Sequence, residues 1–179
     1  MESTHTHPNP TLDKLTQYGA LAVLVIIVLA VPLQLVLAVV GAPFFVLTAL
    51  FTLLFAPFIL LLMTTTPALS LSANGLTLQP RIWKTRFIPW DAVTAVKPYP
   101  LLPPADAEVT RKALAGRKKY RPAEGVMLVI PALPLPYRFG GFFAGEGFTP
   151  VIAVTTRTHT DYDDLVRQIR QHTKAAQHA

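Results

Sequence analysis

The sequence predicts an α+β membrane protein, in which an N-terminal hairpin of two transmembrane helices precedes an antiparallel β-domain closed by a C-terminal α-helix. Two observations predict this architecture. From Leu15 to Pro80 the chain has no Asp, Glu, Lys, Arg or His, and most of this segment is apolar. From Leu69 the pattern changes to the two-residue alternation of β-strands. We therefore expect a disordered tail at 1–14, the hairpin at 15–66, the β-domain at 67–174 and a short tail at 175–179.

The first ten residues place His5 and His7 among prolines and small polar residues. This composition buries too little apolar surface to order itself, so we expect a flexible tail. Two histidines could bind a metal ion weakly, but structural sites use four ligands. We favour solvated histidines and predict neither a metal nor a cofactor.

The apolar segment is long enough for two membrane passes, since a bilayer core about 30 Å thick needs roughly 20 apolar residues per helix. We predict helices at 18–40 and 44–63, joined by a turn at Gly41–Pro43. Pro32 and Pro57 predict kinks, because proline removes a helical hydrogen bond. The first helix is too long for the apolar region of a typical signal peptide, although a cleaved signal followed by one anchor stays an alternative.

The flanks of the hairpin predict its orientation. The connection is too short to hold a domain, so both termini lie on one side, together with the cations Lys14, Arg81, Lys84 and Arg86. The positive-inside rule then places both termini in the cytoplasm and the protein in the inner (plasma) membrane. Gln34 could hydrogen-bond across the hairpin or to a second copy. Ionisable groups are absent from both predicted spans, which disfavours transport.

The β-domain opens with a predicted hairpin. Alternating runs at 69–73 and 76–79 flank Asn74-Gly75, a dipeptide that favours a turn with positive φ at both positions. In the strand expected at 81–88, we predict that the face carrying Trp83 and Phe87 points into the core.

Further strands are expected at 93–97, 126–130 and 151–155, and the run at 126–130 is predicted to be buried on both faces or at a sheet centre. Trp90 is interpreted as a core aromatic with a bonded indole N–H, with an interfacial anchor or a ligand-stacking residue as alternatives.

The segment 98–125 is rich in prolines and cations, and a short helix is expected at 105–115. From Pro67 onward the chain has 15 Lys and Arg against 8 Asp and Glu, a net charge of +7. The cations could form a solvated loop, a clamp for anionic lipid headgroups, or a site for RNA or an acidic protein; we favour lipid over nucleic acid and predict no nucleic-acid partner. The densest cluster comprises Arg111, Lys112, Arg117, Lys118, Lys119 and Arg121.

Two further segments complete the domain. The glycine-rich stretch 139–147 fits no phosphate-binding motif and is predicted to be a flexible hairpin or loop, whose Phe142 and Phe143 either dip into the membrane interface or close the core. After the last strand, Thr160 is expected to cap an amphipathic helix. Its apolar stripe comprises Tyr162, Leu165, Val166 and Ile169.

Catalytic patterns are weak throughout the sequence. The chain has no cysteine, which excludes disulfides and thiolate chemistry. His159 lies near Asp161 in the sequence, but no motif places a nucleophile beside them. We predict that the protein is not an enzyme and has no small-molecule substrate. The lack of a catalytic motif disfavours the alternative of an enzyme that acts on lipid or cell-wall precursors.

The order of these elements, the turn Ile88-Pro89-Trp90-Asp91-Ala92-Val93 and the helix opening Asp161-Tyr162-Asp163-Asp164-Leu165-Val166 resemble small bacterial membrane proteins with a pleckstrin-homology-like (PH-like) domain. The resemblance implies a β-sandwich or partly open barrel capped by the C-terminal helix, and a scaffold or binder rather than an enzyme. It also implies that Lys84 and Arg86, at alternate strand positions, contact phosphates.

These expectations combine into one functional hypothesis. The chain is expected to be a membrane-anchored PH-like module whose partners are membrane lipids, with Lys84, Arg86 and the cations of 111–121 engaging anionic headgroups or an acidic protein. The alternative is an accessory or assembly subunit of a larger membrane complex. In that case the hairpin would pack against a partner protein or a second copy.

Overall fold

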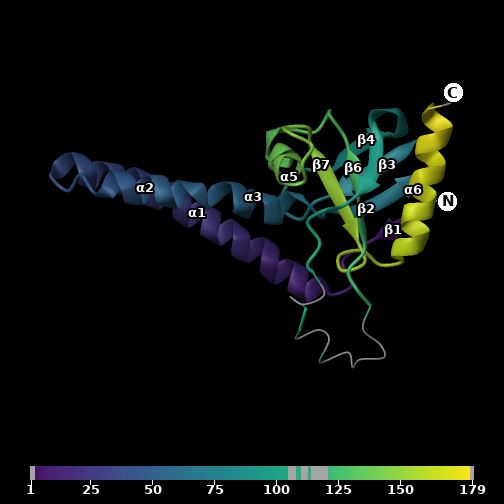
Figure 1. The fold of residues 1–179 in the computed structure, drawn as a ribbon, viewed down its shortest axis with the longest axis horizontal. Helices are drawn as coiled ribbons and strands as arrows, with labels where there is room; N and C mark the ends of the chain where they lie inside the picture. Colours follow the sequence, from purple (N-terminus) through teal and green to yellow (C-terminus); the bar gives the residue numbers. More distant parts are fainter. Residues whose placement is uncertain (1–2, 105–107, 110–112, 114–120, 178–179) are drawn as a thin grey trace.

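In the computed structural model, which describes residues 3–104, 108–109, 113 and 121–177, a helical hairpin projects from a β-domain (Figure 1). Helix α1 (Pro10–Val40) runs away from the domain, and α2 (Phe45–Leu54) and α3 (Ala56–Thr64) return to it. Both arms of the hairpin are long and apolar enough to cross a membrane, and most of their side chains are exposed. The exposed fractions of Leu29 and Leu47 are 68% and 71%.

Helix α1 begins eight residues earlier than predicted, and the preceding segment is ordered rather than a flexible tail. Asn9 accepts a hydrogen bond from the Leu12 amide at 3.0 Å, and Pro10 occupies the first turn, where its missing N–H costs nothing. Strand β1 (Ser3–His5) pairs antiparallel with β2 (Ala68–Ser72). Pairing with β2 gives the backbone N–H and C=O groups of this polar segment hydrogen-bond partners, and this orders the segment although it buries little apolar surface.

The two arms contact each other along the hairpin. Gln34 Nε2 donates to Thr52 Oγ1 at 3.4 Å, which is the cross-hairpin bond that the sequence offered as one of two options. The return arm is interrupted at Phe55, two residues before Pro57, whereas α1 continues through Pro32. Only one of the two prolines therefore breaks its helix.

The strands form two antiparallel sheets that do not close into a barrel. The first has the order β1-β2-β3-β4, with β3 at Gly75–Gln79 and β4 at Arg86–Pro89. The second has the order β5-β6-β7, with these strands at Ala95–Pro98, Gly125–Val129 and Val151–Thr155. The C-terminal helix α6 (Tyr162–Gln177) lies on the side of the domain away from the hairpin (Figure 1).

The main core lies between the two sheets and α6, and the second sheet is buried on both faces. Val126 and Leu128 of β6 face the main core, whereas Met127 and Val129 pack in a second cluster that includes Tyr99. This confirms the prediction for the apolar run at 126–130, which is the central strand of its sheet. The main core also contains Leu69, Leu71, Leu76, Leu78, Ile88, Ile152, Val154, Leu165, Val166 and Ile169.

The predicted hairpin at β2 and β3 is confirmed, but its turn differs from the expected one. Ala73 and Asn74 form the turn, and Gly75 pairs with Ser72 in the ladder. Among the described non-glycine residues only Asp161 has a positive φ. Glycine is required at position 75 because the backbone of β4 lies too close for a side chain: a Cβ there would be 2.3 Å from the Ile88 carbonyl oxygen.

The predicted inward face of the strand at 81–88 is wrong. The strand begins only at Arg86, and Phe87 is 56% exposed while Ile88 is 5% exposed. Ile88 pairs with Leu76, whose side chain lies in the core, whereas Phe87 pairs with Thr77. Cross-strand partners share a face of the sheet, so the register decides which apolar residue is buried.

The glycine-rich segment also differs from its prediction. Its first five residues, 139–143, belong to helix α5 (Arg138–Phe143), which follows a 3₁₀ turn at Leu135–Tyr137, and both the turn and the helix pack against α3. The rings of Phe143 and Phe58 lie 5.0 Å apart.

Helix α6 begins at Tyr162, so the residue before it is Asp161 rather than the expected Thr160. Most of the helix expected at 105–115 lies outside the described residues.

Trp90 is a core aromatic, as predicted. Its indole Nε1 donates to the Ser72 carbonyl at 3.1 Å, and its ring stacks on His172 with centroids 4.9 Å apart. The bond joins the turn Trp90–Ala92 to the end of β2.

Replacing Trp90 with Phe is expected to lower the free energy of unfolding by about 1–2 kcal/mol, because the Ser72 carbonyl loses its donor and the ring stack shrinks. Thermal unfolding of the full chain in detergent micelles measures the effect. Trp83→Phe is the matched control, since the buried Trp83 Nε1 has no hydrogen-bond partner among the described residues. Equal destabilisation by both substitutions would contradict the role assigned to the Ser72 bond.

Candidate functional site

Residues 65–67 connect α3 to β2, and we call this segment the joint. Hydrogen bonds from β7 and from the loop after β7 fix its position. The backbone N–H of Ala153 in β7 donates to the Thr65 carbonyl at 2.7 Å. His159 Nε2 donates to the Pro67 carbonyl at 3.0 Å, and its Nδ1 accepts from Thr158 Oγ1 at 2.9 Å. The return arm of the hairpin is thus hydrogen-bonded to the domain as it ends.

His159 is a neutral imidazole at this joint. Burial lowers its pKa to about 4, with the nearby His5 and His7 acting in the same direction, while hydrogen bonds to the backbone of Pro67 and Thr155 oppose the shift. A neutral ring can donate from Nε2 and accept at Nδ1, which matches the partners found on its two sides. His159 therefore has a structural role in the joint.

The outgoing arm is fixed to the same region by side chains near the base of α1. Arg81 donates to Asp13 Oδ2 from Nε at 3.0 Å and from Nη2 at 2.7 Å. Gln17 Nε2 donates to the Leu62 carbonyl at 3.3 Å, which joins α1 to α3. Both arms are therefore attached to each other and to the β-domain where they meet it.

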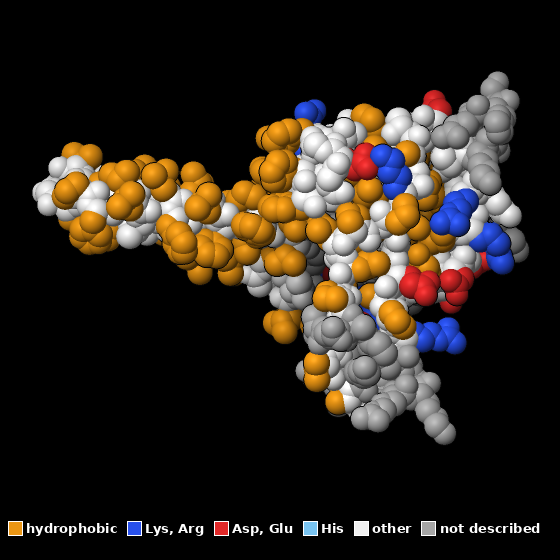
Figure 2. Space-filling model, in the orientation of Figure 1, with side chains coloured by type: hydrophobic (Ala, Val, Ile, Leu, Met, Phe, Trp, Pro, Cys, Tyr) orange, Lys and Arg blue, Asp and Glu red, His pale blue; other side chains and the backbone are white. Residues whose placement is uncertain are grey.

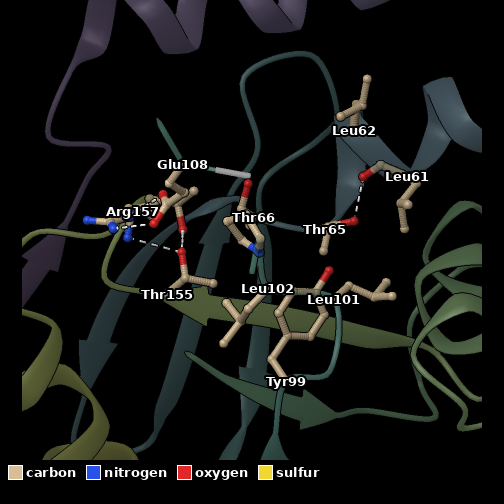
Figure 3. A pocket seen from close by; sticks show the side chains of 12 residues that line it. Leu61, Leu62, Thr65, Thr66, Tyr99, Leu101, Leu102, Glu108, Thr155 and Arg157 are labelled. Carbon is tan, nitrogen blue, oxygen red and sulfur yellow. Dashed lines mark hydrogen bonds and ion pairs between the residues drawn. The ribbon is translucent and has the colours of Figure 1, made fainter. Parts of the chain in front are cut away.

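Beside this joint lies a pocket of about 590 Å³, between the end of α3, the loop after β5 and the end of β7 (Figure 3). Leu61 and Leu62 line it from α3, and Tyr99, Leu101 and Leu102 line it from the loop. Burial raises the pKa of Tyr99 to about 12, so its phenol stays neutral. The four leucines and this neutral tyrosine make this side of the pocket mostly apolar.

The opposite side of the pocket is polar and contains a partly buried ion pair. Arg157 donates to both carboxylate oxygens of Glu108, from Nε to Oε1 at 2.9 Å and from Nη2 to Oε2 at 2.6 Å. The Glu108 side chain is only 5% exposed. Arg157 Nη2 also donates to the Arg121 carbonyl at 2.7 Å. This two-bond geometry fixes the orientation of both groups and gives the pocket one charge of each sign.

The described cations among the predicted site residues belong to different sheets. Arg86 begins β4 at the edge of the first sheet, and Lys84 precedes that strand, so the two are not at alternate positions of one strand. Arg121 lies before β6 of the second sheet. All three side chains are exposed. The remaining predicted residues lie outside the described part of the chain: Arg111, Lys112, Arg117, Lys118 and Lys119.

Glu108 and Arg157 were not predicted as a pair. They are 49 residues apart in the sequence, and Glu108 lies near the start of the helix expected at 105–115. The only local signal was that Glu108 is the last acid before the cation-rich segment. In the described ranges, no group of three His, Cys, Asp or Glu side chains could hold a metal ion.

Comparisons of the chain with protein-family models, with curated proteins and with solved structures found no significant match.

Proposed function

We propose that this chain is a non-catalytic, membrane-anchored binding module of the PH-like type. Its hairpin spans the plasma membrane with both termini in the cytoplasm, and its β-domain engages anionic lipid headgroups at that surface. The observation that carries the proposal is the exposed apolar hairpin, whose two ends are hydrogen-bonded to a basic domain through Asp13 and Thr65.

The dimensions of the hairpin support membrane insertion. At 1.5 Å per residue, the 31 residues of α1 extend about 46 Å, which exceeds a hydrocarbon core of about 30 Å. Its exposed leucines, valines and isoleucines would face water in solution, whereas lipid provides the apolar solvent that such surfaces require. Charged residues begin just outside the apolar stretch, at Asp13 and Lys14 before it and at Arg81 after it.

The face of the domain around α5 supports a close approach to the bilayer. Leu135, Phe142 and Phe148 are exposed, and the rings of Phe142 and Phe148 stack at 5.5 Å. Because α5 packs on α3, this face continues the apolar surface of the hairpin, and hydrophobic side chains gather there in Figure 2. Aromatic residues are enriched at the level of lipid headgroups. We infer that this face contacts the interfacial layer.

The topology supports the PH-like assignment. Strands β2–β4 form one antiparallel meander, β5–β7 form another, and α6 packs on the core between them. Strand β1 is an addition from the segment before the hairpin. Open-ended arrangements of this kind bind ligands through exposed side chains and loops, where the cations of this domain lie.

Charge reversal tests headgroup binding. The full chain in nanodiscs of neutral lipid is expected to co-float with anionic vesicles and not with neutral ones, and less so as salt rises. The double substitution Lys118→Glu and Lys119→Glu should weaken this association at least tenfold, since each cation near an anionic surface contributes about 1 kcal/mol.

The matched control is Arg167→Glu with Arg170→Glu on α6, which makes the same change in net charge on the side away from the hairpin. Binding to anionic vesicles should survive in this variant. If the two double variants lose binding equally, headgroup binding by the 111–121 cations is wrong and only net charge matters.

A further inference from the structure

We propose that the loop after α5, residues 144–149, inserts into the boundary between the headgroups and the acyl chains of the bilayer, and that the ion pair of Lys97 with Glu146 permits this insertion by cancelling the charge of the loop. The side chains that enter are Phe148 and, at the end of α5, Phe142. The inference rests on the proposed membrane anchoring and deepens it, because it names the segment that enters the membrane and the residues that control its entry.

A series of aromatic contacts connects this loop to the hairpin. The ring of Phe58 in α3 lies 5.0 Å from the ring of Phe143, which lies 5.5 Å from the ring of Phe142. Phe142 in turn stacks on Phe148 at 5.5 Å. Figure 2 shows hydrophobic side chains continuing from the hairpin onto this face of the domain. Because Phe58 belongs to a candidate membrane span and is itself exposed, the bilayer that surrounds it is the partner next to the loop.

The loop holds its two exposed rings in a fixed place. The Glu146 amide donates to the Gly141 carbonyl at 2.9 Å, and the Thr149 amide donates to the Glu146 carbonyl at 3.2 Å. The loop packs directly on α5, because a Cβ at Gly141 would lie 1.8 Å from the Thr149 carbonyl oxygen. Phe142 and Phe148 are nevertheless 54% and 63% exposed. Rings that are already ordered in an exposed position lose little conformational entropy when lipid covers them.

The charge of the loop is confined to one residue, which is paired. Glu146 is the only charged residue in the stretch 139–150, and it lies between Phe142 and Phe148 in the sequence. Lys97 Nζ, from β5, donates to both of its carboxylate oxygens, at 2.7 and 2.8 Å. An unpaired carboxylate resists leaving water and is repelled by anionic headgroups, whereas the pair carries no net charge.

The two members of the pair are therefore not equivalent in their effect on insertion. Without Lys97, the loop carries an unpaired negative charge toward an anionic surface. Without Glu146, the Lys97 ammonium is attracted to the same surface and can reach the headgroups along its flexible stem. A pair that only braced the loop would instead give the same loss when it is broken from either side.

Nitroxide labels at single introduced cysteines test the insertion, because the chain has no cysteine of its own. The full chain is reconstituted in nanodiscs of phosphatidylcholine and phosphatidylglycerol. For each label, the measured quantity is its accessibility to oxygen, which concentrates in lipid, divided by its accessibility to a water-soluble nickel chelate. Labels in Phe148→Cys and in Leu47→Cys, on the exposed surface of the hairpin, should both report lipid. A label in Arg170→Cys on α6 should report water.

Lys97→Gln should lower the oxygen-to-nickel ratio of the label at position 148 by about threefold, because Glu146 is then unpaired. Glu146→Gln is the matched control, since it breaks the same pair from the other side, and it should keep or raise the ratio. Both variants should unfold at the wild-type temperature, because ion pairs at the surface contribute little to stability.

The outcomes separate this inference from the proposed anchoring. A label at position 148 that reports water, while the label at position 47 reports lipid, overturns the insertion of the loop and leaves the membrane anchoring intact. Water at both positions overturns both proposals. An unchanged ratio in Lys97→Gln, or an equal loss in Lys97→Gln and Glu146→Gln, overturns the role of the pair in cancelling the charge of the loop.

Discussion

Replacing Arg157 with Met is expected to lower the free energy of unfolding by about 3 kcal/mol. The substitution removes the guanidinium that pairs with both oxygens of Glu108, and leaves that carboxylate in a site where its side chain is 5% exposed. Breaking a buried ion pair from one side typically costs 3–5 kcal/mol. We expect the lower end of that range because Arg157 itself is partly exposed. Chemical denaturation of the full chain in detergent micelles measures the loss.

The double variant Glu108→Gln with Arg157→Met separates pairing from packing. It removes both charges, so it should be more stable than Arg157→Met alone, although the Arg121 carbonyl still loses its donor. Arg167→Met provides the control, because the exposed pair of Arg167 with Asp164 on α6 should be worth less than about 1 kcal/mol. An Arg157→Met variant as stable as the Arg167→Met variant would show that the buried pair contributes nothing to stability.

The parts of the fold that could be predicted from the sequence are those with a local signal. The hairpin follows from an uncharged apolar stretch, and the β2–β3 hairpin follows from alternation around Asn74-Gly75. Trp90 followed from the general need of a buried indole for a hydrogen-bond partner. In each case the physical cause lies within a few residues of the element itself.

The parts that could not be predicted depend on distant partners. Strand β1 exists because residues 69–71 offer it a sheet edge, and nothing in its own composition indicates that. Phe87 and Ile88 are both apolar, so only the register with Leu76 and Thr77 decides which one is buried. The same holds for the candidate site, since the Glu108–Arg157 pair is created by the fold rather than by a motif.

His159 should make the stability of this protein depend on pH. Its pKa is about 4 in the folded chain and about 6.5 when unfolded, so between these values the unfolded state binds more protons. Stability is therefore fully present above about pH 6.5, and it falls as the pH decreases toward about 4. The shift corresponds to roughly 3 kcal/mol, at about 1.4 kcal/mol per pH unit.

Denaturation of the wild-type chain and of His159→Gln between pH 7 and pH 4 measures this term, because the variant keeps every other titrating group. The variant should be less stable at pH 7, where the packing of the ring is lost, but its stability should fall less steeply with acid. Parallel curves for the two proteins would exclude His159 as the source of the dependence.

The hydrogen bonds of His159 also indicate which part of the folded protein opens first on acidification. A protonated ring still donates from Nε2 to the Pro67 carbonyl, and its Nδ1 can donate to the Thr158 hydroxyl, but Nδ1 can no longer accept from the Thr155 amide. The Thr155 amide therefore loses its acceptor while Pro67 keeps its donor. Hydrogen exchange at the Thr155 amide should accelerate toward pH 4, relative to the intrinsic rate, before exchange does so in the centre of β6. Simultaneous acceleration at both positions would instead indicate global unfolding and would contradict an opening that starts at the joint.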